Sequence, residues 1–311
     1  MSVGSRPLVP SRLAPGGVAH GSRRTATSTV GAYVALTKPR IIELLLITTV
    51  PTMIVAQGGW PSTWLVIVTL IGGSLAAGGA NAINMYVDRD IDRLMERTKN
   101  RPLVTGAIEP GRALVFAVAL EVVAFAVLWA GANLLSALLA LSATAFYVGV
   151  YTLWLKRTSR QNIVIGGAAG AVPVLVGWSA VQNDLAWTPV VLFAAMFFWT
   201  PPHFWALAIK YVDDYRAADV PMLPAVVPLS HAVRQMIGHT VAMVVCTLVL
   251  IPVADLGALY SVAAIVLGLA FLGAVVRLGL RPSPAASMRV FAFSITYVTV
   301  LFGAMSLDVL L

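Results

Sequence analysis

Long runs of apolar residues, separated by short polar segments, dominate the chain from residue 41 onward. Nine of these runs approach the ~20 residues that an α-helix needs to cross the hydrocarbon core of a bilayer. They cover residues 41–57, 64–86, 112–131, 134–155, 162–181, 188–209, 235–254, 257–280 and 288–310. The pattern predicts an all-α membrane protein, a bundle of nine transmembrane helices with no separate soluble domain.

Composition and charge agree with this prediction. The chain is 59% hydrophobic and 11% charged, whereas soluble domains are about 25% charged. All 21 Lys and Arg residues lie before the first predicted span or at alternate loops after it, and such charges collect on the cytoplasmic side. This distribution predicts an N-terminus inside and a C-terminus outside. The net charge of +8 is then a signal of topology, and we predict no nucleic-acid partner.

Residues 1–36 differ in character from the rest of the chain. They are rich in Ser, Gly, Pro and Arg, contain no acid and lack the apolar core of a secretory signal. We predict a disordered basic tail at 1–36 and an intramembrane domain at 37–311, in a bacterial inner (plasma) membrane. An acid-poor, Arg-containing start also resembles an organellar transit peptide, so the mitochondrial inner membrane is the alternative.

Three oxygen-bearing side chains recur at the inside end of the second predicted span. Asn84, Asp88 and Asp92 are four residues apart, so an α-helix places them on one face. Mg²⁺ is typically held by one or two carboxylates together with substrate phosphates. We therefore predict a Mg²⁺ site at these three residues. In the alternative interpretation this is a solvated helix end, with the acids offset by Arg89 and Arg93.

A second acidic cluster, Asp213, Asp214 and Asp219, follows the sixth predicted span. Lys210 and Asp214 are four residues apart and would share a helix face. We expect Asp214 to hold a cation and Lys210 to meet a phosphate oxygen as a point charge. Two such clusters in one bundle would together suit a diphosphate.

Three cations follow the first acidic cluster directly: Arg97, Lys99 and Arg101. Beside a metal site they would bind diphosphate oxygens and stabilise a leaving group. The tendency of Lys and Arg to collect on the cytoplasmic side explains the charges equally well, but not their position next to carboxylates.

The run from Asn84 to Pro102, NMYVDRDIDRLMERTKNRP, resembles the first aspartate motif of the UbiA-type intramembrane aromatic prenyltransferases. Its MERTKNRP continuation is similar to the haem O synthase (protohaem IX farnesyltransferase) branch. Four other segments share this resemblance, in the same order, within residues 33–305: TKPR at 37–40, YVGVYTLWLKR at 147–157, PPHFWAL at 201–207 and PMLP at 221–224.

The resemblance implies transfer of a farnesyl group from farnesyl diphosphate to the vinyl group of haem b, with Mg²⁺ as cofactor. It implies catalytic roles for Asn84, Asp88, Asp92, Lys210 and Asp214, with Asp214 also among the metal ligands. It further implies candidate partners downstream, namely haem A synthase or cytochrome oxidase assembly factors. The residues expected to bind substrate are Lys38, Arg97, Arg101, Tyr147, Tyr151, Lys156, His203 and Trp205.

Three of these expectations concern aromatic side chains. Tyr147 and Tyr151 share a helix face, where their rings would stabilise an allylic cation or anchor the helix at the membrane interface. His203 is a candidate ligand of haem iron, with a hydrogen-bonded packing residue as the alternative. Trp205 is expected to line the porphyrin pocket.

The second motif departs from the pattern of the wider superfamily, Y-x3-K-x3-D-x3-D. The corresponding frame here reads Ala206, Lys210, Asp214 and Ala218, so a second cation would lack one carboxylate. Two other functions stay open. One is a prenyltransferase acting on a quinone precursor, 4-hydroxybenzoate or dihydroxynaphthoate, and the other is a transporter, since helix ends with Asp and Lys also coordinate ions.

Overall fold

The computed structural model describes residues 29–311, without the side chains of residues 41 and 44–46, and this part of the chain is helical with no strand. Helix α1 (Thr29–Thr37) leads into α2 (Pro39–Gln57). Eight later helical segments are long and apolar enough to cross a membrane. They are α3 (Thr63–Val87), α6 (Pro110–Gly131), α7 with η1 and α8 (Leu134–Thr158), α9 (Asn162–Gln182), α10 (Trp187–Lys210), α13 (Leu229–Val253), α14 (Ala258–Leu280) and α15 (Pro284–Leu310).

These segments confirm an all-α membrane protein and match eight of the nine predicted spans to within a few residues, apart from an earlier start of α13. The first predicted span corresponds to α2. Within α2, the apolar segment Ile47–Gln57 is shorter than the length needed to cross a membrane. A ninth span and the orientation of the two termini therefore stay predictions.

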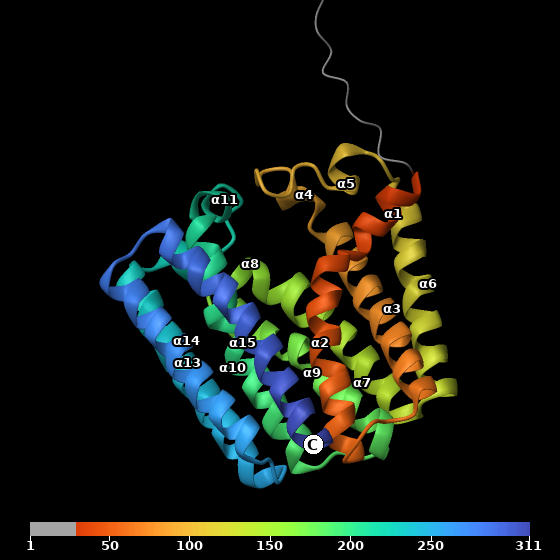
Figure 1. The fold of residues 1–311 in the computed structure, drawn as a ribbon. Helices are drawn as coiled ribbons and strands as arrows, with labels where there is room; N and C mark the ends of the chain where they lie inside the picture. Colours follow the sequence, from red (N-terminus) through yellow and green to blue (C-terminus); the bar gives the residue numbers. More distant parts are fainter. Residues whose placement is uncertain (1–28) are drawn as a thin grey trace, which may run out of the picture.

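Figure 1 shows the long helices standing side by side, with neighbours in the chain generally adjacent in space. Helix α9 packs against α2, α7 and α10, and the last helix, α15, returns to pack against α2 and α10. Small residues let these helices approach closely. A Cβ at Gly177 of α9, for example, would lie 2.6 Å from the carbonyl oxygen of Thr49 in α2.

Short helices gather at one end of the bundle. Figure 1 places α4 (Arg89–Asp92), α5 (Pro102–Thr105) and α11 (Val212–Ala217) together at the top, and the C-terminus at the opposite end. A further short helix, α12 (Leu223–Val226), follows α11. Because α4 and α11 carry the two acidic clusters, both clusters lie at the same end of the bundle.

Helix α1 falls within the segment predicted to be a disordered tail, so that prediction is wrong for residues 29–36. Ala32 and Leu36 are buried, and they join a hydrophobic cluster with Ala82 and Met85 of α3 and Leu103 of α5. Burial of these apolar side chains stabilises the helix. The rest of the predicted tail, residues 1–28, lies outside the described residues.

The fourth predicted span is not a regular α-helix throughout. After α7 (Leu134–Ala145), residues Phe146–Leu155 form a π-helix, η1, and α8 (Lys156–Thr158) ends the span. π-helical turns are rare and occur frequently at functional sites. The part of this span that leads into α8 therefore presents its side chains in a register that a 3.6-residue period does not predict.

Candidate active site

The first acidic cluster lies where α3 gives way to α4. Asp88 ends α3 with φ −83° and ψ 4°, but the chain keeps four-residue hydrogen bonds across the break, from Asp88 N–H to the Asn84 carbonyl and from Asp92 N–H to the Asp88 carbonyl, both 2.9 Å. The side chains of all three residues are buried. Asn84 Nδ2 also donates to Asp88 Oδ2 at 2.7 Å. The spacing seen in the sequence thus brings the amide and the first carboxylate into contact.

Cations from elsewhere in the chain pair with these buried carboxylates. Lys156 Nζ contacts Asp88 Oδ2, and Arg101 donates to Asp92 Oδ2 at 2.6 Å. The alternative in which Arg89 and Arg93 offset the acids is wrong. Arg89 donates to the carbonyl of Tyr86 at 2.5 Å, and Arg93 pairs with no carboxylate in the described part of the chain.

A further acid in α4, Asp90, lies between Asp88 and Asp92 in the chain and has a different partner. Its two oxygens each accept a 2.7 Å hydrogen bond from the guanidinium of Arg157. These bonds lower the pKa of Asp90 to about 2. Arg157 also lies 3.8 Å from Asp88 Oδ1 and donates to the carbonyl of Val87 at 3.4 Å. It therefore ties the break between α3 and α4 to α8, a role that the sequence analysis did not assign.

Lys38 reaches the same cluster from the start of α2. It adopts the left-handed conformation, with φ 53° and ψ 62°, which costs energy for a residue with a side chain. Its Nζ donates to Asn84 Oδ1 at 2.9 Å. Burial, together with the positive charges of Arg101 and Lys156, lowers the pKa of Lys38 to about 7. An amine held in this way is placed to contact an anion at the cluster.

The donor set fits Mg²⁺. Asp88 Oδ1 is buried and has no hydrogen-bond partner, a condition that costs free energy unless a cation or a donor approaches. Among residues 29–311 no group of three His, Cys, Asp or Glu side chains is placed to enclose a metal. Two carboxylates and an amide oxygen, completed by water and phosphate, form the kind of site that Mg²⁺ uses.

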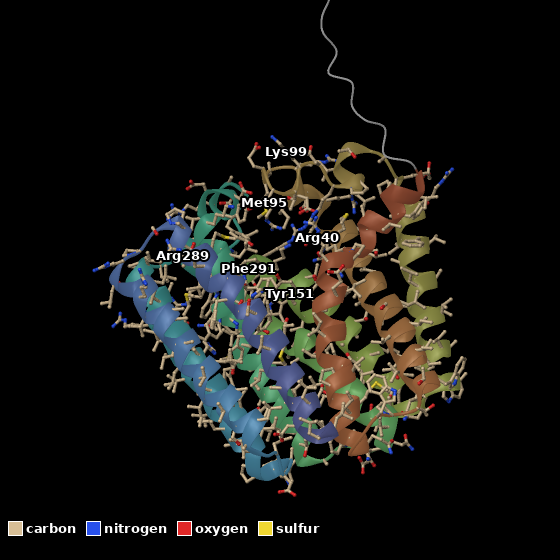
Figure 2. All side chains as sticks on the ribbon, viewed as in Figure 1. Arg40, Met95, Lys99, Tyr151, Arg289 and Phe291 are labelled. Atoms are coloured by element: carbon tan, nitrogen blue, oxygen red, sulfur yellow. The ribbon has the colours of Figure 1, made fainter. Side chains whose placement is uncertain are left out.

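The second acidic cluster meets the first through the loop between α4 and α5. The backbone N–H of Arg97 donates to Asp214 Oδ2 at 3.0 Å, and the guanidinium of Arg97 lies 5.8 Å from the ring centre of Tyr211. Figure 2 shows the loop residues Met95 and Lys99 at the end of the bundle where α11 lies. The structure thus brings Asp214 to the loop that carries Arg97 and Arg101.

Lys210 and Asp213 are exposed and make fewer contacts with the rest of the site than the sequence predicted. Helix α10 ends at Lys210 and α11 begins two residues later, so Lys210 and Asp214 do not share one continuous helix. Lys210 is exposed, with Nζ 5.3 Å from the Tyr211 ring centre, and pairs with no acid among the described residues. Asp213 is fully exposed beside Arg216, 3.7 Å away.

Helix η1 supplies the aromatic pair. The rings of Tyr147 and Tyr151 stack with centres 5.4 Å apart and planes inclined by 18°. On the same helix Thr152, fully buried, accepts a 3.1 Å hydrogen bond from Asn84 Nδ2. The sequence did not single out Thr152, because its contact with Asn84 depends on how η1 meets α3.

His203 and Trp205 lie in the hydrophobic core. His203 is buried between the rings of Trp199 and Phe291, at 4.3 and 4.6 Å, and its Nδ1 lies 2.6 Å from Ser294 Oγ. Trp205 is fully buried, and its Nε1 has no partner. This environment matches that of a hydrogen-bonded packing histidine; ligation of haem iron through the other ring nitrogen stays a prediction, as does the role of Trp205.

Comparison with known sequences gives consistent results. The model of the UbiA prenyltransferase family matches residues 45–298. A protein named protoheme IX farnesyltransferase from Clavibacter sepedonicus is 53% identical over 285 residues, covering 90% of this chain and 92% of that protein. A protein of the same name from Frankia alni is 54% identical over 283 residues, covering 89% of this chain and 97% of its own length.

Solved structures share the fold at low identity. A structure described as digeranylgeranylglyceryl phosphate synthase has a TM-score of 0.75 at 16% identity and covers 90% of this chain and 98% of its own. A UbiA homologue from Archaeoglobus fulgidus, bound to DMAPP and Mg²⁺, has a TM-score of 0.66 at 18% identity, with 88% and 99% coverage. Both likenesses concern the arrangement of the helices.

Proposed function

The chain belongs to the UbiA prenyltransferase family, and we propose that it transfers the farnesyl group of farnesyl diphosphate to the vinyl group of haem b in a bacterial plasma membrane. The observation that carries this proposal is the contact between Arg97 and Asp214, which links the loop after the first acidic cluster to the second cluster. A diphosphate with its metal ion needs carboxylates and cations around one point. The acceptor is inferred from the bacterial relatives named protoheme IX farnesyltransferase.

We propose that Asn84, Asp88 and Asp92 hold Mg²⁺, and that Asp214 holds a second cation directly or through water. The A. fulgidus homologue bound to Mg²⁺ and DMAPP supports a divalent metal in this fold. The ion would supply Lewis-acid neutralisation of the diphosphate. Here Asp88 Oδ1 is buried without a hydrogen bond, and the guanidinium of Arg157 lies 3.8 Å away, so this oxygen has room for a closer cation.

Cationic side chains complete the diphosphate site. Lys38 contacts the amide oxygen of Asn84, and Arg101 and Lys156 contact the carboxylates of Asp92 and Asp88. Each would exchange part of its present contact for a phosphate oxygen. Arg97 and Lys210, both exposed, would approach from the loop and from the end of α10. Such donors stabilise the charge that develops on the leaving group.

The reaction needs no nucleophilic side chain. The allylic C–O bond breaks, and the diphosphate leaves with the electron pair. The faces of Tyr147 and Tyr151 would stabilise the farnesyl cation. The vinyl π electrons of haem form the new C–C bond, and water adds to the resulting cation and loses a proton, which gives a hydroxyethylfarnesyl substituent. The apolar helices delay capture of the first cation by water.

We further propose that His203 and Trp205 contact the porphyrin. His203 offers one ring nitrogen beyond its contact with Ser294, and Trp205 offers an unpartnered Nε1. The farnesylated haem would pass to a protein that consumes it, for which haem A synthase or a cytochrome oxidase assembly factor is the proposed partner. The lipid bilayer is a further partner, indicated by the eight apolar helices.

The test of this function compares acceptors. Detergent-purified protein would be incubated with farnesyl diphosphate, Mg²⁺ and one of haem b, 4-hydroxybenzoate or dihydroxynaphthoate, and the products separated by chromatography and identified by mass. We expect a more apolar haem whose mass has increased by one farnesyl group and one hydroxyl group. Prenylation of an aromatic acid without any haem product would overturn the proposal in favour of a quinone precursor.

A further inference from the structure

Thr152 is placed to control the orientation of the Asn84 side chain. Its Oγ1 donates to the carbonyl of Tyr147 at 2.9 Å. A hydroxyl has one hydrogen to donate, so toward any other group Thr152 Oγ1 is an acceptor. The group that it meets is Asn84 Nδ2, at 3.1 Å.

This acceptor and Asp88 Oδ2 together determine which end of the Asn84 amide faces which way. With Nδ2 turned to Thr152 Oγ1 and Asp88 Oδ2, the amide oxygen must face the other way, where Lys38 Nζ reaches it at 2.9 Å. The flipped amide would set its oxygen against two acceptors. Both Asn84 and Thr152 are buried, so bulk water is not available to replace a lost bond.

The π-helix makes this arrangement possible. In an α-helix a threonine hydroxyl can bond to the carbonyl three or four residues earlier, whereas Thr152 bonds to the carbonyl five residues earlier. The bond therefore follows the wider turn of η1. From this part of the span, the side chain of Thr152 contacts Asn84 and the side chain of Lys156 contacts Asp88.

We propose that Thr152 is a positioning residue that acts through Asn84. It keeps the amide oxygen turned away from Thr152, where a metal ion can take over the contact that Lys38 Nζ now makes. This inference rests on the proposed function. Residues that orient a ligand typically change metal affinity by about 10- to 100-fold when they are removed. We therefore expect Thr152→Val to raise the half-saturating Mg²⁺ concentration by about tenfold and to leave kcat at saturating Mg²⁺ much less affected.

The experiment measures the thermal unfolding midpoint of the purified protein against Mg²⁺ concentration, with inorganic diphosphate present. A ligand that binds the folded state raises this midpoint, so the readout needs neither haem nor turnover. Thr152→Ser, which keeps the hydroxyl, should behave like the wild type. Thr144→Val is the matched control, because Thr144 is another buried threonine of the same span and bonds instead to Glu121, at 3.2 Å.

A double-mutant cycle separates positioning from packing. In an Asn84→Ala background the added Thr152→Val change should have no further effect on the Mg²⁺ response.

The inference is overturned if Thr152→Val responds like the wild type, if Thr152→Ser is equally impaired, or if the effect persists without Asn84. Should Thr152→Val not fold, Thr152→Ala replaces it. If the wild type itself shows no response to Mg²⁺, both this inference and the proposed metal site fail, while haem farnesylation is judged separately by its product.

Discussion

The backbone N–H of Arg97 and the Oδ2 atom of Asp214 lie 3.0 Å apart, although the two residues are separated by 117 positions in the chain. The bond joins the loop between α4 and α5 to α11. It uses one oxygen of the carboxylate and leaves the other to meet a cation. The proposed function therefore gives Asp214 two separable tasks, ordering the loop and carrying charge.

Substitutions at Asp214 should separate these tasks. Asp214→Asn keeps an oxygen acceptor for Arg97 but loses the charge, and we expect kcat for farnesyl transfer to fall about 100-fold, because stabilisation of the leaving group by a cation is worth several kcal/mol. Asp214→Ala should additionally raise KM for farnesyl diphosphate, since the loop loses its anchor. Product formation measured over a range of substrate concentrations tests both.

Asp213 provides the matched control for Asp214. Its side chain is fully exposed, and surface substitutions of this kind usually change stability by less than about 0.5 kcal/mol. Asp213→Asn should leave kcat and KM near their original values. An equal loss of activity in both variants would contradict the assignment of Asp214.

The buried pair of Lys156 and Asp88 gives a prediction about stability. The Lys156 side chain is 12% exposed and that of Asp88 is 0% exposed, so Lys156→Met leaves a buried carboxylate without its main partner. We expect a loss of about 3 kcal/mol in the free energy of unfolding, seen as a lower midpoint of unfolding in detergent.

The double variant Asp88→Asn/Lys156→Met distinguishes folding from chemistry. Neutralising both partners should restore much of the stability, because no charge is left buried alone, whereas farnesyl transfer should stay abolished. Recovery of activity together with stability would show that neither charge takes part in the reaction.

Asp308, far from the acidic clusters, should matter for stability alone. It lies near the end of α15 and accepts hydrogen bonds from the backbone N–H groups of Gly257 and Tyr260, the latter at 3.1 Å, where α14 begins. Asp308→Ala should cost about 1–2 kcal/mol, the usual value for a lost helix cap, measured by unfolding in detergent. The kcat of the folded fraction should not change, and a large fall in it would contradict a purely structural role.

Much of the fold follows from the sequence because a span is defined by length and apolar composition, which are local properties. Eight spans were predicted to within a few residues except at the start of α13, which begins at Leu229, before the apolar run predicted at 235–254. The helix at Thr29–Thr37 was missed because its stability comes from tertiary burial of Ala32 and Leu36. The π-helix was missed because apolar periodicity does not distinguish a few widened turns within a mostly apolar helix.

Only part of the candidate site could be predicted from the sequence, because local spacing can be read from it and tertiary contacts cannot. Asn84 and Asp88 were found from four-residue spacing, and their contact is seen in the structure. The pairing of Asp90 with Arg157, the role of Thr152 and the contact of Arg97 with Asp214 depend on how distant helices meet. Spacing along one helix carries no information on such contacts.

The central claim is that Asp88 and a divalent cation together drive farnesylation of haem. The most direct measurement is the mass of the haem recovered after incubation with farnesyl diphosphate, for the wild type and for Asp88→Asn, with Mg²⁺ or with a chelator. We predict farnesylated haem from the wild type with Mg²⁺, none with the chelator, recovery when Mg²⁺ is restored, and a loss of at least about 100-fold in Asp88→Asn. Farnesylated haem formed equally well without a divalent cation, or by Asp88→Asn, would contradict the claim.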